Sequence, residues 1–293
     1  MNSESGADRL PFDSHAHYFD SRFEREYPGG APALLETLLG KEICGAVNVG
    51  TQLETSRLAL EQARAFPGLY CAVGIHPEDC HTVDYGPEEG VRRLEEMILE
   101  DRKTDGSKIV AVGEIGLDYH YPMYGEIPMD KEREKAFFCA QMELARKYGL
   151  PVLIHDRDAH GDCFDLIAAH PGVRGVMHSY SGSAEMVREY VRLGWYISFS
   201  GVLTFRNASR PVQAALSVPD DRLLVETDCP YLAPEPYRGS LNHSGKMRKT
   251  VERLAEIRGQ SVQEIIRLTT DNAQRLFGIR LSDGQAKGPE HRL

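Results

Sequence analysis

Long apolar runs and an export signal are both missing from this chain of 293 residues. No stretch of about 18 apolar residues occurs, so the sequence predicts no membrane span. The first residues, MNSESGADRLPFD, contain no basic stretch followed by an apolar one, which is the pattern of a secretory signal. We therefore expect a cytoplasmic protein that does not enter a membrane.

Cysteine pairs with the spacing of a metal site are also missing. None of the six cysteines forms a Cys-x-x-Cys pair, and their spacing is irregular. This pattern disfavours a zinc knuckle. Without an export signal, it is typical of reduced thiols in a cytosolic protein.

Positive charge is scarce as well. The chain has 34 Lys and Arg against 44 Asp and Glu, which gives a formal net charge of −10. Broad electrostatic binding of nucleic acid needs a basic face, and this composition disfavours one. A nucleic-acid substrate is still compatible with the sequence, because two divalent cations in one cleft would create a local positive field.

The chain does contain short apolar segments that alternate with amphipathic ones. Several of them are continuous runs rich in Val and Ile, which is typical of buried parallel strands. The segments are residues 10–17, 45–50, 69–76, 108–118, 150–157, 175–182, 195–201 and 223–230. Eight strand–helix units in about 280 residues fit a closed (β/α)8 TIM barrel better than an open sheet. No GxGxxG motif follows the first segment, which disfavours a dinucleotide-binding fold.

Helices are predicted between these strands. They cover residues 55–66, 90–101, 131–148, 163–170, 185–193 and 246–258. Asp162 and Ser183 are expected to cap two of them, and residues 120–129 and 233–245 are expected to be loops. We expect a single barrel domain over residues 10–281, a flexible lead over residues 1–9 and a flexible tail over residues 282–293.

Residues suited to metal or acid–base chemistry stand at the ends of most predicted strands. In a (β/α)8 barrel, the carboxyl ends of all strands open on one face, and the active site lies there. Four imidazoles and two carboxylates favour Zn, Mn, Co or Fe over Ca, and Mg stays compatible with a phosphate substrate. The candidate ligands are His15, His17, Glu114, His155, His178 and Asp228.

Three of these candidates have positions that suggest a specific role. His15 and His17 are two residues apart on one strand, so both side chains point the same way and can reach one cation. Glu114 lies in an apolar run with glycines nearby, and a carboxylate can bridge two cations. A buried salt bridge is the alternative for Glu114, and satisfied core positions are the alternative for lone histidines.

Arg157 and His76 are the candidate substrate-binding residues. Arg157 follows His155 by two positions, so it points to the same side, where a guanidinium can stabilise charge on phosphate oxygens. An ion pair with Asp118 or Asp158 is the alternative. His76 can contact the phosphate or the leaving group, or it can serve a structural turn.

Three further ideas follow from residues near the strand ends. A third metal at His76, shared with Glu226 or a nearby carboxylate, is the first of them. Phe205 and Tyr231 are candidates for stacking on a base. Asp228, besides being a ligand, is the candidate catalytic group that takes a proton from bound water.

The chain resembles the TatD family of metal-dependent deoxyribonucleases, within the amidohydrolase-type barrels. The resemblance covers almost the whole chain in the expected order. It rests on DSHAH (13–17), VGIHP (73–77), VGEIGLDYH (112–120), LIHDRDA (153–159), HSYSGS (178–183), SGVLTFRNA (200–208), ETDCPYLAP (226–234), YRG (237–239) and DNAQRLFG (271–278). It implies hydrolysis of DNA, single-stranded or exonucleolytic, with the same six metal ligands and Glu114 as the bridge.

One segment departs from the family pattern. Members often carry a PHRGKRNEP-like segment, whereas residues 236–244 read PYRGSLNHS here, with two basic residues and one acid lost. This change puts the substrate in doubt, so a hydrolase of an ester, lactone or amide, including an aminoacylated RNA, is the alternative. A non-enzymatic barrel is disfavoured because all six ligands are kept. We expect two divalent metal ions, with zinc ahead of magnesium and manganese, a DNA substrate and a monomer.

Overall fold

Eight parallel strands lie at the centre of the structure, a computed structural model that describes residues 9–281. Each strand pairs with the next one along the chain. They are β1 (Phe12–Ala16), β2 (Gly45–Val49), β3 (Leu69–Val73), β4 (Ile109–Asp118), β7 (Val152–Arg157), β8 (Gly175–Met177), β9 (Tyr196–Phe199) and β10 (Leu223–Val225). All eight fall within the predicted apolar segments, and the predicted barrel is confirmed.

Strands β1 and β10 close the ring without a regular ladder. Ala16 forms an isolated parallel bridge with Cys229. The amide of Asp228 donates to the carbonyl of His15 over 2.9 Å, and the amide of His17 donates to the carbonyl of Cys229 over 2.7 Å. The segment that carries Asp228 is therefore fixed directly beside the two histidines of β1.

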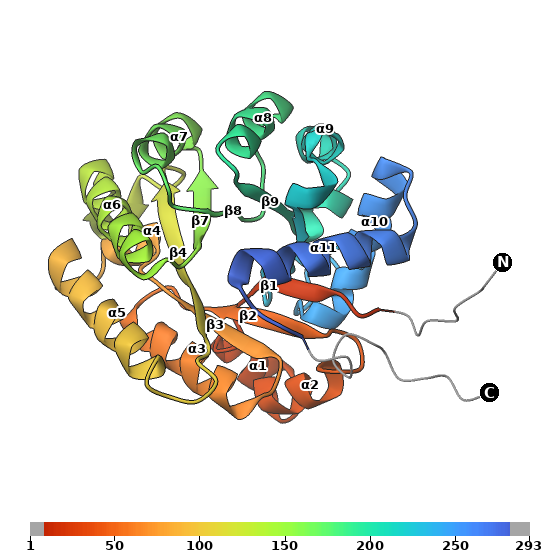
Figure 1. The fold of residues 1–293 in the computed structure, drawn as a ribbon, viewed down its shortest axis with the longest axis horizontal. Helices are drawn as coiled ribbons and strands as arrows, with labels where there is room; N and C mark the ends of the chain where they lie inside the picture. The colour runs from red at the N-terminus through yellow and green to blue at the C-terminus, as the bar shows by residue number, and fades with distance from the viewer. Residues whose placement is uncertain (1–8, 282–293) are drawn as a thin grey trace.

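A ring of helices surrounds the strands (Figure 1). The helices are α1 (Ser21–Glu26), α2 (Gly30–Leu38), α3 (Leu53–Ala65), α4 (Pro77–Cys80), α5 (Pro87–Asp101), α6 (Lys131–Tyr148), α7 (His160–Ala169), α8 (Ala184–Arg192), α9 (Ser209–Ser217), α10 (Met247–Arg258) and α11 (Val262–Phe277). Within residues 9–281, no helix is long and apolar enough to span a membrane.

The hydrophobic core has two parts because successive strand side chains point to opposite faces. Ala46 belongs to the larger cluster between the sheet and the helices, whereas Val47 and Val49 belong to a smaller cluster inside the barrel. Phe277 of α11 joins the inner cluster, and its ring centroid lies 6.3 Å from that of Phe12, the first residue of β1. Helix α11 therefore covers the amino ends of the strands and leaves their carboxyl ends open.

The predicted helices differ from the observed ones mainly at their ends. Helix α6 has the predicted bounds, and Ser183 caps α8 as predicted by accepting from the amide of Met186. The cap predicted at Asp162 is wrong, since α7 begins at His160 and Asp162 lies in its first turn. The Asp162 carboxylate is instead engaged by Lys135 and by the hydroxyl of Tyr119.

Several elements were not predicted. Five helices lie outside the predicted helical segments: α1, α2, α4, α9 and α11. The loop expected at 120–129 contains a two-stranded hairpin, β5 (Met123–Tyr124) and β6 (Ile127–Pro128). Arg9, expected in the flexible lead, donates to Gln263 and pairs with Asp271. Residues 1–8 and 282–293, the rest of the expected lead and tail, lie outside the described residues.

Candidate metal centre

The predicted site residues meet at the carboxyl ends of the strands, around a cavity of about 660 Å³. His15 is fully buried beneath the cavity, and the other predicted residues line it. His155 and Arg157 lie on β7. His17, His178 and Asp228 lie just beyond the carboxyl ends of β1, β8 and β10, respectively. The lining residues predicted from the sequence are His17, His76, Glu114, His155, Arg157, His178 and Asp228.

Glu114 reaches the centre of this cavity because β4 is longer than its neighbours. Val112 pairs with Val73, the last residue of β3, so Glu114 lies two residues beyond that end. A side chain at Gly116 would overlap the carbonyl oxygen of His155, and its φ of 144° is also unfavourable for other residues. Gly116 therefore allows β4 and β7 to approach closely at the site.

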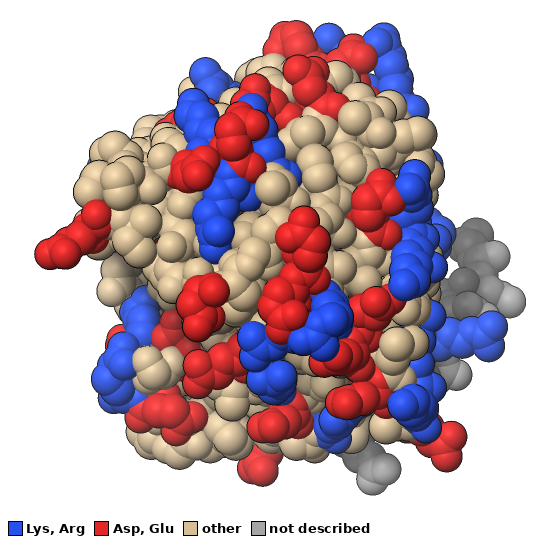
Figure 2. Space-filling model, turned by 90° about the vertical axis from the view of Figure 1, so that its left-hand side faces the viewer, with Lys and Arg blue, Asp and Glu red and all other residues tan. Residues whose placement is uncertain are grey.

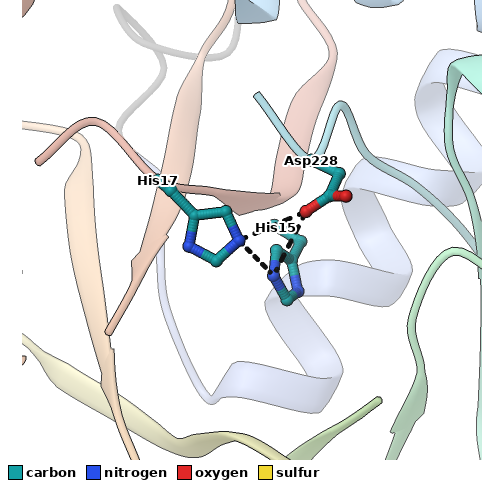
Figure 3. A group of neighbouring side chains, drawn as sticks. All are labelled: His15, His17 and Asp228. Atoms are coloured by element: carbon teal, nitrogen blue, oxygen red, sulfur yellow. Dashed lines mark hydrogen bonds and ion pairs between the residues drawn. The ribbon is translucent and has the colours of Figure 1, made fainter. Parts of the chain in front are cut away.

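Side chains of His15, His17 and Asp228 point toward one another in the first group of polar atoms (Figure 3), and one oxygen of Glu114 lies beside this group. Nε2 of His17 lies 3.1 Å from Nε2 of His15 and 3.2 Å from Oδ1 of Asp228. Oε2 of Glu114 lies 3.3 Å from Nε2 of His15 and 3.6 Å from Nε2 of His17. Nε2 of His15 lies 3.8 Å from Oδ1 of Asp228. A tetrahedral cation with bonds of about 2.0–2.1 Å has ligand atoms about 3.3–3.4 Å apart, so the atoms of His15, His17 and Asp228 have approximately the spacing of three ligands. We call these three atoms, together with Oε2 of Glu114, the first cluster.

The second group of atoms lies around the other oxygen of Glu114. Oε1 of Glu114 is 2.8 Å from Nε2 of His178 and 3.0 Å from Nδ1 of His155. The two ring nitrogens are 3.4 Å apart. These three atoms, the second cluster, have the spacing of three ligands and leave further positions for water or substrate.

The outer nitrogens of three histidine rings fix which nitrogen faces the centre. Nδ1 of His17 donates to the carbonyl of Val49 over 2.7 Å. Nε2 of His155 faces Oδ2 of Asp118 at 2.9 Å, and Nδ1 of His178 faces Oε1 of Glu226 at 3.1 Å. With these outer nitrogens protonated, each inner nitrogen presents a lone pair to a cation, as in carboxylate–histidine–metal sites.

His76 has the opposite arrangement. Its Nδ1 accepts a hydrogen bond from the amide of Glu78, so the neutral ring carries its proton on Nε2. That Nε2 lies 3.5 Å from Oε1 of Glu114. His76 therefore offers a hydrogen-bond donor at the cavity, although its position beside Glu114 and His155 also gives it the spacing of a ligand.

Glu226 and Asp118 lie behind the two histidines of the second cluster. Glu226 does not share a site with His76; its Oε1 accepts from His178 and from the amide of Ser179. Among residues 9–281, His76 instead shares a possible cation group with Glu114 and His155, and a third metal near His76 stays a prediction. The sequence signal for both carboxylates was present, since each stands at a strand end, but their supporting role was missed.

Asp13 supports the first cluster from below and was also not assigned a role. Its fully buried carboxylate accepts from the amides of His15 and Thr227 and from the hydroxyls of Thr227 and Ser244. Burial raises its pKa to about 6, although these hydrogen bonds lower it in part. The network ties β1 to the segment after β10 that carries Asp228.

Burial and charge act against each other in the protein without metal. Burial alone would raise the pKa of Glu114, but the nearby histidines, His178 foremost, hold it well below its usual value. Burial would lower the pKa of His155, but hydrogen bonds to Asp118 and Glu114 raise it to about 9. Burial and the neighbouring His178 lower the pKa of His15.

Arg157 lies at the rim of the cavity with 41% of its side chain exposed. Its guanidinium is 4.0 Å from Asp118 and 4.9 Å from the ring centroid of Tyr121. No contact with Asp158 accompanies this pair among the described residues, where Asp158 instead pairs with His120. The long distance to Asp118 leaves the guanidinium available to a ligand in the cavity.

The fold and the site together define a class. A (β/α)8 barrel with buried histidine and carboxylate clusters at the carboxyl ends of its strands has the architecture of a metal-dependent hydrolase. The family described as TatD related DNase matches residues 12–278. The chain belongs to this TatD family, and the resemblance noted in the sequence is confirmed.

Relatives and solved structures agree with this assignment. The chain is 34% identical over 270 residues to an uncharacterized metal-dependent hydrolase of Bacillus subtilis, covering 92% of this chain and 99% of the relative. It is 32% identical to an uncharacterized metal-dependent hydrolase of Mycobacterium tuberculosis, covering 84% and 90%. A TatD homologue from Escherichia coli superposes with a TM-score of 0.79 at 25% identity, covering 92% and 98%.

Proposed function

We propose that this protein hydrolyses phosphodiester bonds of single-stranded DNA with two divalent cations. The observation that carries the proposal is the position of Glu114, whose two carboxylate oxygens face two separate groups of ligand atoms. A carboxylate in this position is the expected bridge of a two-metal hydrolytic site.

The proposed ligands follow the two clusters. His15, His17 and Asp228 would hold one cation, His155 and His178 the other, and Glu114 both. The mixed nitrogen and oxygen donors favour zinc, with manganese or magnesium as alternatives. When bound, the two cations would lower the pKa of a coordinated water and neutralise charge on the phosphate.

The chain's own residues would then move the proton and position the substrate. Asp228 accepts the proton of the attacking water, whose oxygen bonds to phosphorus as the bond to the leaving oxygen breaks. Arg157, at the rim, contacts a non-bridging oxygen. His76 donates its Nε2 proton in a hydrogen bond to the phosphate or the leaving oxygen.

The family and the arginine at the rim of the cavity favour a phosphodiester substrate, whereas the net charge of −10 does not. Figure 2 shows acidic and basic side chains interleaved on one face of the molecule, with no wholly basic area. Binding of DNA would therefore depend on local contacts at the cavity, where Arg157 stands, and on the bound cations. The family description as DNase supports the same substrate.

The test compares substrate classes on one preparation. Protein stripped of metal and reloaded with zinc, manganese or magnesium is assayed on single-stranded DNA, duplex DNA, RNA, and a panel of carboxylic esters, lactones and aminoacylated RNA. We expect metal-dependent cleavage of single-stranded DNA, lost by at least about 100-fold in Asp228→Asn. Cleavage of an ester, lactone or aminoacylated RNA without cleavage of DNA would replace the proposed substrate by the alternative class.

A further inference from the structure

A second hollow of about 360 Å³ adjoins the metal cavity, and Tyr231 and Leu232 line both. Its other walls include Arg22, Phe205 and Arg238, and we call it the arginine groove. Its volume lies within the range of small-ligand sites. The shared residues make it a lateral continuation of the proposed catalytic cavity.

Arg238 offers an unpaired positive charge in this groove. Its guanidinium carbon lies 4.3 Å from the centroid of the Phe205 ring, which holds the exposed side chain in place by a cation–π contact. Within residues 9–281, the guanidinium forms no ion pair or hydrogen bond. A guanidinium that is held in place and free of a carboxylate is ready to bind an anion.

Tyr231 connects the groove with the first cluster. Its ring centroid lies 6.3 Å from that of His17, and its hydroxyl donates to Asp20 over 2.6 Å. The residue is 46% exposed, so one part of the ring is open to the groove. Arg22 lies with its guanidinium carbon 6.0 Å from this ring and shares its charge with Glu26.

The segment that departs from the family pattern forms one side of this groove. Lys246 does not reach into it, because its Nζ is bonded to the carbonyl of Leu241 and the hydroxyl of Ser240. Arg238 is therefore the positive group that residues 236–244 present beside the metal cavity.

We propose that the arginine groove binds the nucleotide next to the scissile phosphodiester of a single-stranded nucleic acid. Arg238 contacts the phosphate of that nucleotide, and its base stacks on the open part of Tyr231. Proteins that bind single strands without sequence preference combine positive groups, which contact the backbone, with aromatic rings, which stack on the bases. This inference rests on the proposed function and names the subsite that would make a strand a better substrate than a small diester.

Binding tests the groove directly. A fluorescent thymidine decamer with cleavage-resistant phosphorothioate linkages is titrated with zinc-loaded protein over a range of salt concentrations. The variants are Arg238→Ala and Tyr231→Leu, and the control is Arg206→Ala, which removes an exposed arginine from the residue next to Phe205 without altering the groove.

The two groove variants should behave differently from each other. Arg238→Ala should weaken binding and reduce the salt slope by about 0.7, the value for one phosphate contact on a single strand. Tyr231→Leu should weaken binding by about tenfold with the salt slope kept, because stacking is not ionic. Equal affinity and equal salt slope for Arg238→Ala and Arg206→Ala would overturn the inference.

Hydrolysis separates this inference from the proposed function. The ratio of kcat/KM for an ordinary thymidine decamer to that for bis(p-nitrophenyl) phosphate should fall at least about fivefold in Arg238→Ala and stay unchanged in Arg206→Ala. No hydrolysis of either diester by the wild type would contradict the proposed function, and the binding titration would still decide on the groove. Hydrolysis of both diesters with a ratio that Arg238→Ala leaves unchanged would contradict the groove alone.

Discussion

The two clusters on either side of Glu114 are supported by different kinds of groups. In the first cluster, the outer nitrogen of His17 donates to a neutral backbone carbonyl. In the second cluster, the outer nitrogens of both His155 and His178 face buried carboxylates, those of Asp118 and Glu226. A carboxylate behind a histidine makes the ring more basic toward a proton and toward a cation alike.

This difference predicts that the two metal positions respond differently to pH and to mutation. The pKa of His178 is held well above its usual value, since the charges of Glu114 and Glu226 outweigh the effect of burial. A cation that enters the second cluster must therefore displace protons from both histidines. In the first cluster, burial would lower the pKa of His17 but Asp228 raises it, whereas the pKa of His15 is lowered. Binding of a cation to the first cluster should therefore release fewer protons.

The largest expected effect comes from the residue that both clusters share. Glu114→Gln removes the charge that faces both groups, so we expect at least about a 100-fold loss of hydrolysis and weaker metal binding at both positions. Asp228→Asn should lose as much hydrolysis while keeping metal in the second cluster. Activity assays measure the loss of hydrolysis, and metal analysis measures the loss of bound metal. Circular dichroism checks that each variant is folded. Wild-type activity in both variants would contradict the assignment of Glu114 and Asp228 to the metal centre.

Removal of one supporting carboxylate should affect one cluster only. Asp118→Asn takes the charge from behind His155, so we expect a 10–100-fold, or about 1.4–2.8 kcal/mol, loss of metal affinity at the second position alone. Competition with a chelator gives the two affinities. Asp162→Asn, which changes an exposed carboxylate bonded to Lys135 and Tyr119, is the control. An equal loss at both positions would contradict the separation of the clusters.

Release of protons on metal binding should also distinguish the two clusters, with a smaller effect. With a pKa of about 9, His155 of the metal-free protein is protonated at pH 7, and binding of a cation must remove that proton. Affinity at the second position should therefore fall by at least about tenfold per unit as pH falls from 9 toward 7, because His178 in the same cluster also has a raised pKa. Calorimetry in buffers of different ionisation enthalpy counts the released protons. Metal uptake at pH 7 with no proton release would show that the histidine is neutral.

The smallest effect is expected at the rim of the second cluster. Arg157→Ala removes a guanidinium that is 41% exposed and 4.0 Å from the carboxylate of Asp118, so folding stability should change by less than about 0.5 kcal/mol. KM for a phosphodiester should rise several-fold, and more than KM for a neutral ester, because only the phosphate carries charge there. Thermal unfolding and steady-state kinetics provide the two values, and equal KM changes for both substrates would argue against a phosphate contact.

The sequence was sufficient to predict the strands and the convergence of the six candidate ligands. Topology alone brings the carboxyl ends of parallel strands together, so residues at those ends must meet whatever the loops do. The 18 residues of α6 have the predicted bounds because Asp130 caps the start and Gly149, with a φ of 66°, ends the helix.

The sequence was not sufficient for the groups behind the ligands. Asp118 and Glu226 stand at strand ends like the ligands themselves, and only the rotation of the imidazole rings decides that they face the outer nitrogens. Helix α1 was missed because its six residues bury only Phe23 and show no apolar period. Helix α2 has such a period at Ala31, Leu34 and Leu38, and this signal was overlooked. The position of the Arg238 guanidinium depends on its contact with the ring of Phe205, which is distant in sequence.

The central claim is that Glu114 joins two metal positions with different supports. Anomalous diffraction from crystals of the zinc-loaded protein tests it most directly. The account predicts two peaks, one among His15, His17 and Asp228 and one between His155 and His178, each within bonding distance of a different oxygen of Glu114. A single peak, or two peaks with Glu114 bound to neither, would contradict it.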